Sequence, residues 1–221
     1  MSTQESAATP DNPHYSDDED RRYISDRLIY FSDAVIAIAM TLLALELPVP
    51  TGKTDAEVWH SFTRMLHNEY LSFLISFVVI GVFWLAHHQF FRKIHAVDAM
   101  MRRLNLIWLL LIVLVPFATR VDSADGDFVL GPVLYAVVIS LVAILIMVMA
   151  WHAVRGGLLR PGIPPSAMRE LMLGAGAAAA GFLISIPVSF VSNSWGRACW
   201  ALILVARIAL RTVSALRRKS S

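Results

Sequence analysis

Six long apolar stretches constrain this chain most, because each is close to the ~20 residues that a helix needs to cross a bilayer. They cover residues 28–47, 69–90, 104–120, 129–151, 170–192 and 197–214. Hydrophobic residues make up 57% of the chain and charged residues only 16%, a balance too apolar for an ordinary soluble domain. The sequence therefore predicts an all-α membrane protein of six transmembrane helices in a single repeat.

Two of the six stretches carry unusual residues. The fifth is rich in glycine and alanine, with Gly174, Gly176 and Gly181 around an alanine run. Small residues let helices approach closely in lipid, so this stretch is a candidate packing surface. The sixth is interrupted by Arg207 and Arg211, which lie near its end, where long basic side chains reach the headgroups.

Residues 1–20 differ from the rest of the chain. They are polar and acidic, with prolines at positions 10 and 13, and bury too little apolar surface to order themselves. They also lack the basic start and short apolar core of a signal peptide. We expect a disordered cytoplasmic tail over 1–20 and a six-helix transmembrane domain over 21–219. The one cysteine, Cys199, excludes an intramolecular disulfide.

The distribution of positive charge predicts the orientation of the chain in the membrane. If the N-terminus is cytoplasmic, 15 of the 19 Lys and Arg residues fall in cytoplasmic segments and four in outer segments. The positive-inside rule then favours cytoplasmic termini, and an even number of spans agrees with it. We expect a multi-pass protein of the cell membrane.

Polar side chains gather where three of the spans begin or end. Ionisable groups in membrane helices usually face protein or water rather than lipid. On the predicted topology these residues share the cytoplasmic side, so we expect a buried hydrogen-bond cluster in which each satisfies another. The members are Arg27, Ser32 and Asp33 in the first span, Trp84, His87 and His88 in the second, and Asn105 in the third.

Motifs of several other functions are absent from the sequence. There is no P-loop, no His-Glu-x-x-His metal motif, no Gly-x-Ser-x-Gly elbow and no Thr-Val-Gly-Tyr-Gly potassium filter. We therefore expect no enzyme, no metal or other cofactor and no nucleic-acid partner.

The first span resembles that of a known family, the transmembrane protein 175 potassium channels in their bacterial six-helix form. The resemblance rests on Arg27-x-x-x-Phe31-Ser32-Asp33 and the apolar run that ends at Glu46. The Trp84-x-x-His87-His88 end of the second span and Asn105 on the third are similar as well.

This resemblance implies a potassium channel whose pore is lined by the first helix, with potassium as the permeant ion. A single motif per chain implies a homotetramer in membrane lipid. The family places its narrowest constriction five residues after the motif aspartate, which is Ile38 here, with Leu42 and Leu45 further along. Thr41 matches a family threonine associated with ion selectivity.

Helical periodicity gives an independent check on this pore face. A spacing of three and four residues places one set of side chains on a single face. Four copies of that face around an axis would form apolar rings that exclude water and a ring of hydroxyls. The set is Phe31, Ala34, Val35, Ile38, Thr41, Leu42 and Leu45.

Plainer interpretations stay open for several of these residues. An apolar stripe is also typical of a packed or lipid-facing helix, and a helical threonine often bonds back to its own backbone. Arg27 fits the positive-inside rule, and His87 and His88 fit a cap or an interface. Glu46 fits either a cation-attracting ring at the outer mouth or the end of the helix.

Two other functions also stay open. A proton-conducting channel or a small secondary transporter is the alternative, because Asp33 and His87 are groups that can relay protons. Paired Gly or Pro interruptions typical of transporter repeats are not visible. A membrane enzyme ranks third, because no nucleophile or cofactor motif is present.

Overall fold

The computed structural model describes residues 13–123, 129–191 and 200. Five helices in this part are long and apolar enough to cross a membrane: Ile24–Leu45, Leu71–Phe91, Ala99–Ser123, Leu130–Arg155 and Pro165–Phe190. They match the first five predicted spans. The predicted sixth span, 197–214, lies outside the described residues apart from Trp200.

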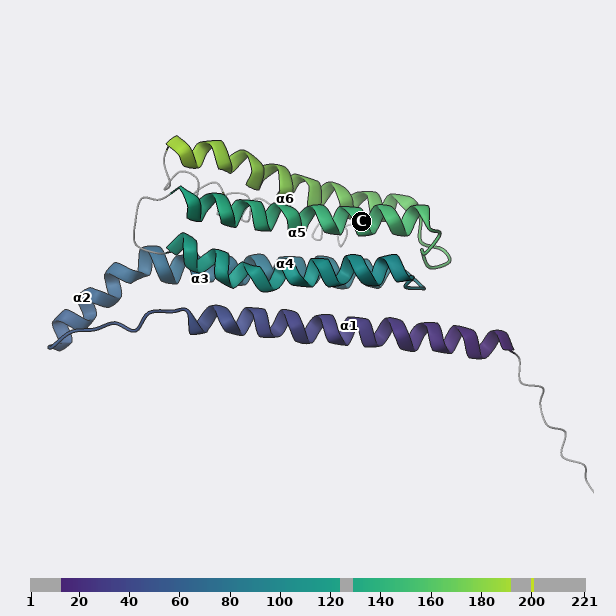
Figure 1. The fold of residues 1–221 in the computed structure, drawn as a ribbon, viewed down its shortest axis with the longest axis horizontal. Helices are drawn as coiled ribbons and strands as arrows, with labels where there is room; N and C mark the ends of the chain where they lie inside the picture. The colour runs from purple at the N-terminus through teal and green to yellow at the C-terminus, as the bar shows by residue number, and fades with distance from the viewer. Residues whose placement is uncertain (1–12, 124–128, 192–199, 201–221) are drawn as a thin grey trace, which may run out of the picture.

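The long helices lie side by side in one elongated bundle (Figure 1). In chain order the elements are α1 (Pro13–Leu45), α2 (Asp55–Met65), η1 (Leu66–Tyr70), α3 (Leu71–Phe91), α4 (Ala99–Ser123), α5 (Leu130–Arg155) and α6 (Pro165–Val191). Helix α1 packs on α3 and α4, α4 packs on α5, and α5 packs on α6. The first span therefore lies at one edge of the bundle, and α6 lies at the other (Figure 1).

The first helix begins earlier than the sequence indicates. We expected disorder up to residue 20, but α1 begins at Pro13, so residues 13–20 are helical and only 1–12 lie outside the described part. Proline suits the first position of a helix, where its missing N–H needs no partner. Pro13 therefore marks the start of the helix and does not prevent it.

A short helix that the sequence analysis did not predict precedes the second span. The hydroxyl of Thr54 accepts a hydrogen bond of 3.3 Å from the Glu57 N–H and caps α2 at its N-terminus. The Glu57 carboxylate in turn accepts a bond from the Lys53 N–H at 2.6 Å. Helix α2 continues through the π-helical turn η1 into α3 and leans away from the bundle (Figure 1).

The small residues of α6 pack within the protomer. Ala175, Ala178 and Ala179 are buried. A Cβ atom on Gly176 would lie 3.4 Å from the Met147 sulfur of α5, in van der Waals contact. The Ser140 hydroxyl of α5 also donates to the Ala179 carbonyl at 3.4 Å. This surface, a candidate for packing between subunits, is used at least in part to hold α6 on α5.

Two loops are joined at the end of the bundle where α3 and α5 finish. Ile94 and Leu159 form an antiparallel β-bridge, and the Arg160 side chain donates to the Ile94 carbonyl at 2.8 Å. Helix α5 ends in a Schellman motif, in which the Leu158 N–H bonds to the Ala153 carbonyl at 3.0 Å. This turn needs a left-handed residue, and Gly157 supplies it with φ of 64°.

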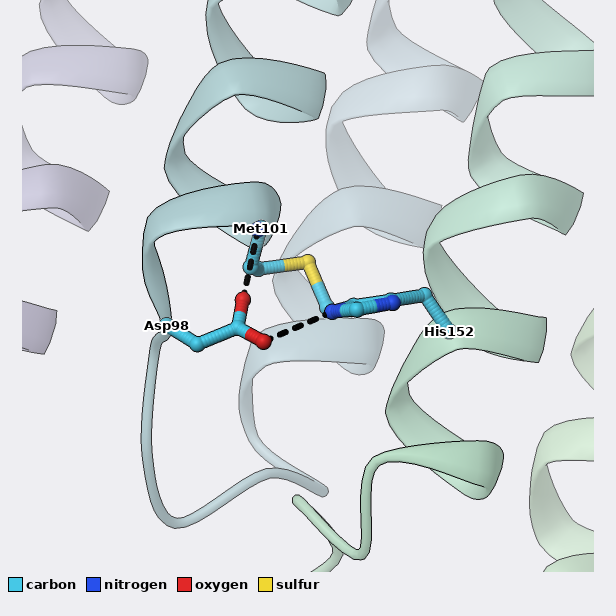
Figure 2. A network of polar contacts seen from close by, with 3 residues as sticks. All are labelled: Asp98, Met101 and His152. Carbon is cyan, nitrogen blue, oxygen red and sulfur yellow. Dashed lines mark hydrogen bonds and ion pairs between the residues drawn. The ribbon is translucent and has the colours of Figure 1, made fainter.

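Asp98 links the start of α4 to the end of α5 (Figure 2). One carboxylate oxygen accepts a bond from the Met101 N–H at 2.7 Å, which caps α4, and the other lies 2.8 Å from His152 Nε2. Burial acts to raise the pKa of Asp98, but these hydrogen bonds and the charges of His152 and Arg102 outweigh it. The pKa of this carboxyl is therefore held below its ordinary value.

This depressed pKa predicts a loss of stability in acid. A carboxyl with a lowered folded-state pKa stabilises the fold above its unfolded pKa and loses that contribution as the pH falls through the folded value. The melting temperature should therefore fall below about pH 4 more steeply in the wild type than in Asp98→Asn, which keeps a capping oxygen but does not ionise. Thermal unfolding in detergent, followed by tryptophan fluorescence, measures both. A constant difference between the two proteins from about pH 5 to pH 3 would contradict the assignment.

Candidate functional site

One face of α1 is buried against α3 and α4. Its residues follow a spacing of four, three and four, which places them in a single stripe along the helix. Ser32 and Ala39 are fully buried, and Ile36 and Leu43 are each 2% exposed. This stripe fixes how α1 is rotated about its own axis, and every other side chain of the first span is placed by it.

A chain of hydrogen bonds joins three helices at the polar end of this stripe. Asn105 of α4 donates from Nδ2 to the Ser32 hydroxyl at 2.9 Å, and its Oδ1 lies 2.8 Å from His87 Nε2 of α3. The Ser32 hydroxyl donates to the Leu28 carbonyl at 2.8 Å. Because the Asn105 oxygen only accepts, His87 must carry its proton on Nε2. All three side chains are fully buried.

Aromatic rings enclose the imidazole of His87. Trp108 stacks on it with ring centroids 4.5 Å apart and planes 14° apart, and Phe91 lies 4.6 Å away on the same helix as the histidine. Within the described part of the chain, His87 Nδ1 and Trp108 Nε1 are buried without a hydrogen-bond partner. The histidine thus keeps one buried acceptor nitrogen that the chain of hydrogen bonds does not use.

Asp33 bonds to Trp84, another member of the polar cluster that the sequence predicts. Its carboxylate accepts a hydrogen bond of 2.8 Å from Trp84 Nε1 on α3, not from a histidine. His88 is exposed, and its ring centroid lies 5.9 Å from that of Trp84. The adjacent residues His87 and His88 therefore have different surroundings. Arg27 and Phe31 are exposed on α1.

The expected pore-facing residues lie on the exposed side of α1, away from the bundle. Ile38 is 58% exposed, and Leu42 and Leu45 are exposed as well. Thr41 lies on the same side, and its hydroxyl donates to the Ile38 carbonyl at 2.8 Å. Thr41 therefore bonds back to its own helix, as one of the plainer interpretations suggested. Its oxygen still has a free lone pair.

Glu46 lies at the other end of α1 and is paired across the bundle. Its carboxylate is 3.0 Å from the Arg120 guanidinium of α4. Both side chains are partly solvent-exposed, so this ion pair contributes little to stability. It does reduce the negative charge that Glu46 would present to an approaching cation.

The sequence analysis missed a second buried polar cluster, near the end of the bundle opposite His87. The Thr119 hydroxyl of α4 lies 2.8 Å from the Ser76 hydroxyl of α3, which lies 3.2 Å from the Tyr135 hydroxyl of α5. All three are buried. Single serine and threonine residues in apolar helices give little sequence signal, because they also bond to their own backbone.

These features define a multi-pass helical membrane protein whose first span is hydrogen-bonded to two others. No group of three His, Cys, Asp or Glu suited to a metal ion occurs among the described residues. Residues 27–116 match the family model described as endosomal/lysosomal potassium channel TMEM175.

Relatives and a solved structure agree with this match. A potassium channel of Streptomyces collinus is 31% identical over 176 residues, which cover 76% of this chain and 84% of that protein. The crystal structure of a lysosomal potassium-selective channel TMEM175 homolog from Chamaesiphon minutus superposes with a TM-score of 0.71 at 27% identity, covering 86% of this chain and 98% of that one. The chain belongs to the TMEM175 family of ion channels.

A vertebrate relative bears a different name. The endosomal/lysosomal proton channel TMEM175 of Danio rerio is 29% identical over 121 residues, which cover 55% of this chain. The match spans only 23% of that longer protein.

The bond between Asp33 and Trp84 predicts how two substitutions at one position differ. Asp33→Ala removes the acceptor and leaves the indole N–H unpaired, which costs about 1–3 kcal/mol of unfolding free energy. Asp33→Asn removes the charge but keeps an accepting oxygen, so its folded yield should stay close to the wild type. Size-exclusion yield and melting temperature measure the effect. An Asp33→Ala protein with normal yield and a changed potassium/sodium ratio would show that Asp33 faces ions instead.

Proposed function

We propose that this protein is a potassium-selective channel and not an enzyme, with four copies of α1 around a central pore. The observation that carries the proposal is the orientation of α1 about its own axis. Its polar residues Ser32 and Asp33 bond to α3 and α4, while Ile38 and Leu42 lie on the exposed side. The names of the bacterial relatives, which are potassium channels, support the permeant ion.

The proposed pore works by excluding water and holds no carbonyl filter. Rings of Ile38, Leu42 and Leu45 would form a narrow apolar constriction through which an ion passes only after losing part of its hydration shell. Potassium holds its shell more loosely than sodium, which sets the direction of selectivity. The free lone pair on each Thr41 hydroxyl would offer a partly dehydrated cation an oxygen contact.

In this proposal the polar residues Ser32 and Asp33 of α1 position the helix and do not conduct ions. The bonds of Ser32 and Asp33 hold the helix against rotation, so that Ile38 stays directed at the axis. A protein of this kind would lie in the cell membrane with both termini cytoplasmic. Its partners would be further copies of itself, lipid and potassium ions.

The first prediction of this proposal concerns assembly. One α1 helix cannot enclose a conduit, so the purified protein should form a closed, symmetric homotetramer. Native mass spectrometry from mild detergent should show four chains per particle. A protein that remains monomeric across several detergents and in nanodiscs would exclude the pore described here.

The second prediction concerns the constriction. Ile38→Asn keeps a similar size but supplies an amide that holds water, which lowers the dehydration barrier for every cation. Conductance should rise and the preference for potassium over sodium should fall, whereas Ile38→Phe should narrow the ring and reduce the current. Bilayer recording of purified protein under bi-ionic potassium/sodium conditions measures both effects.

Two isoleucines serve as controls for this experiment. Ile36 is buried in the bundle, so Ile36→Asn should lower the folded yield without raising conductance per channel. Ile184 on α6 is 65% exposed, close to the 58% of Ile38, so Ile184→Asn should fold and leave conductance unchanged. Equal effects of the Ile38 and Ile184 substitutions would mean that α1 does not present Ile38 to the ion path.

A proton-conducting channel is the alternative function, and one observation favours it. His87 keeps a buried acceptor nitrogen without a partner among the described residues, next to a chain of hydrogen bonds that ends on the Leu28 carbonyl. The name of the Danio rerio relative agrees with proton transport. Recording under a pH gradient in the absence of potassium and sodium separates the two functions, because only a proton path would carry current.

A further inference from the structure

A groove of about 360 Å³ lies between the last turn of α5 and the first two turns of α6. It belongs to neither the proposed pore nor the polar cluster around Asn105. Each helix contributes residues spaced three or four apart, which lie on one face of that helix. The lining residues are Trp151, Val154, Pro165, Ser166, Arg169 and Met172.

One guanidinium group lines this groove, and a second lies over the ring of a lining residue. Arg169 lines it directly, and Arg155 lies over the Trp151 ring with its central carbon 4.6 Å from the ring centroid. The cation–π contact holds the Arg155 charge beside the aromatic wall. Neither arginine forms an ion pair with any residue of the described ranges, and Glu170, next in sequence to Arg169, does not line the groove. The site thus carries net positive charge.

The groove also has an apolar wall that a soluble anion would not need. Val154, Met172 and the Trp151 ring line the groove together with Arg169. Trp151 is 48% exposed, and tryptophan is enriched where membrane helices meet the headgroups. Positive charge at a helix end above an apolar wall is the arrangement that binds an anionic lipid, with its phosphate on arginine and its chain on the wall.

We propose that this groove binds one anionic phospholipid. The headgroup phosphate accepts hydrogen bonds from the guanidinium groups of Arg155 and Arg169 and from the Ser166 hydroxyl. The upper part of one acyl chain lies against Trp151, Val154 and Met172. On the proposed orientation of the chain, this lipid belongs to the cytoplasmic leaflet.

Native mass spectrometry of the full-length protein from nanodiscs tests the proposal. The nanodiscs contain phosphatidylcholine with a minor fraction of phosphatidylglycerol, and the retained lipid is identified and counted. The wild type should retain phosphatidylglycerol in preference to phosphatidylcholine. Arg169→Gln should reduce this retention about fivefold, the effect expected of one basic residue near anionic lipid, and a double substitution with Arg155→Gln should reduce it further.

Arg92→Gln is the matched control. Arg92 is an exposed arginine at the end of α3, on the same side of the membrane, and it does not line the groove. An equal loss of retention in Arg92→Gln, or equal retention of the two lipids by the wild type, would overturn the proposal. A final arm adds millimolar inorganic phosphate: retained phosphatidylglycerol supports a lipid site, and full displacement would show a simple anion site instead.

Discussion

The hydrogen bonds between Asn105 and its two partners are the constraint on which the rest of the structure depends. In the hydrocarbon core no water is available to satisfy a buried polar group, so each must find a partner within the protein. Asn105 uses its amide in both directions, donating to Ser32 and accepting from His87. This arrangement holds the first span on α3 and α4 in one orientation about its own axis. The exposed position of Ile38 follows from that orientation.

The same rule explains why α3 and α4 are joined near both ends. Toward one end lies the cluster around Asn105, and toward the other Ser76 and Thr119 bond to each other and to Tyr135 of α5. The loops that follow α3 and α5 are joined by a β-bridge and by the bond from Arg160 to Ile94. Ser32 and Asp33, near the middle of helix α1, bond to α4 and α3, and Glu46 just after its end forms an exposed ion pair with Arg120. Side-chain and loop bonds thus join α3, α4 and α5 to one another, while these bonds and the buried stripe hold α1 on α3 and α4.

Much of this architecture could be predicted from the sequence, because membrane helices carry a strong length and hydropathy signal. The first five spans follow from patterns in the chain, and so does the expectation of a polar cluster shared by the first three spans, but the choice of His87 over His88 as the partner of Asn105 does not. The partner of Asp33 could not be predicted, because its choice between Trp84 and a histidine depends on the relative rotation of α1 and α3. The pairing of Ser76 with Tyr135 could not be predicted either, because 59 residues separate them and their contact depends on how α3 and α5 pack. Two N-cap signals were visible in the sequence but were not used: Thr54 with Glu57 at the start of α2, and Asp98 before α4.

The sequence separation of the bonds to α1 has a consequence for biosynthesis. Ser32 precedes Asn105 by 73 residues, and Asp33 precedes Trp84 by 51. At a ribosomal rate of about 5–20 residues per second, the first span waits roughly 4–15 s before its serine can meet the asparagine. The Asp33 carboxylate has no partner from the later helices until Trp84 has been made, and the Ser32 hydroxyl has none until Asn105 has been made; lipid offers them none. The nascent first helix must therefore stay near water or the insertion machinery, and it docks only once the third span has been made.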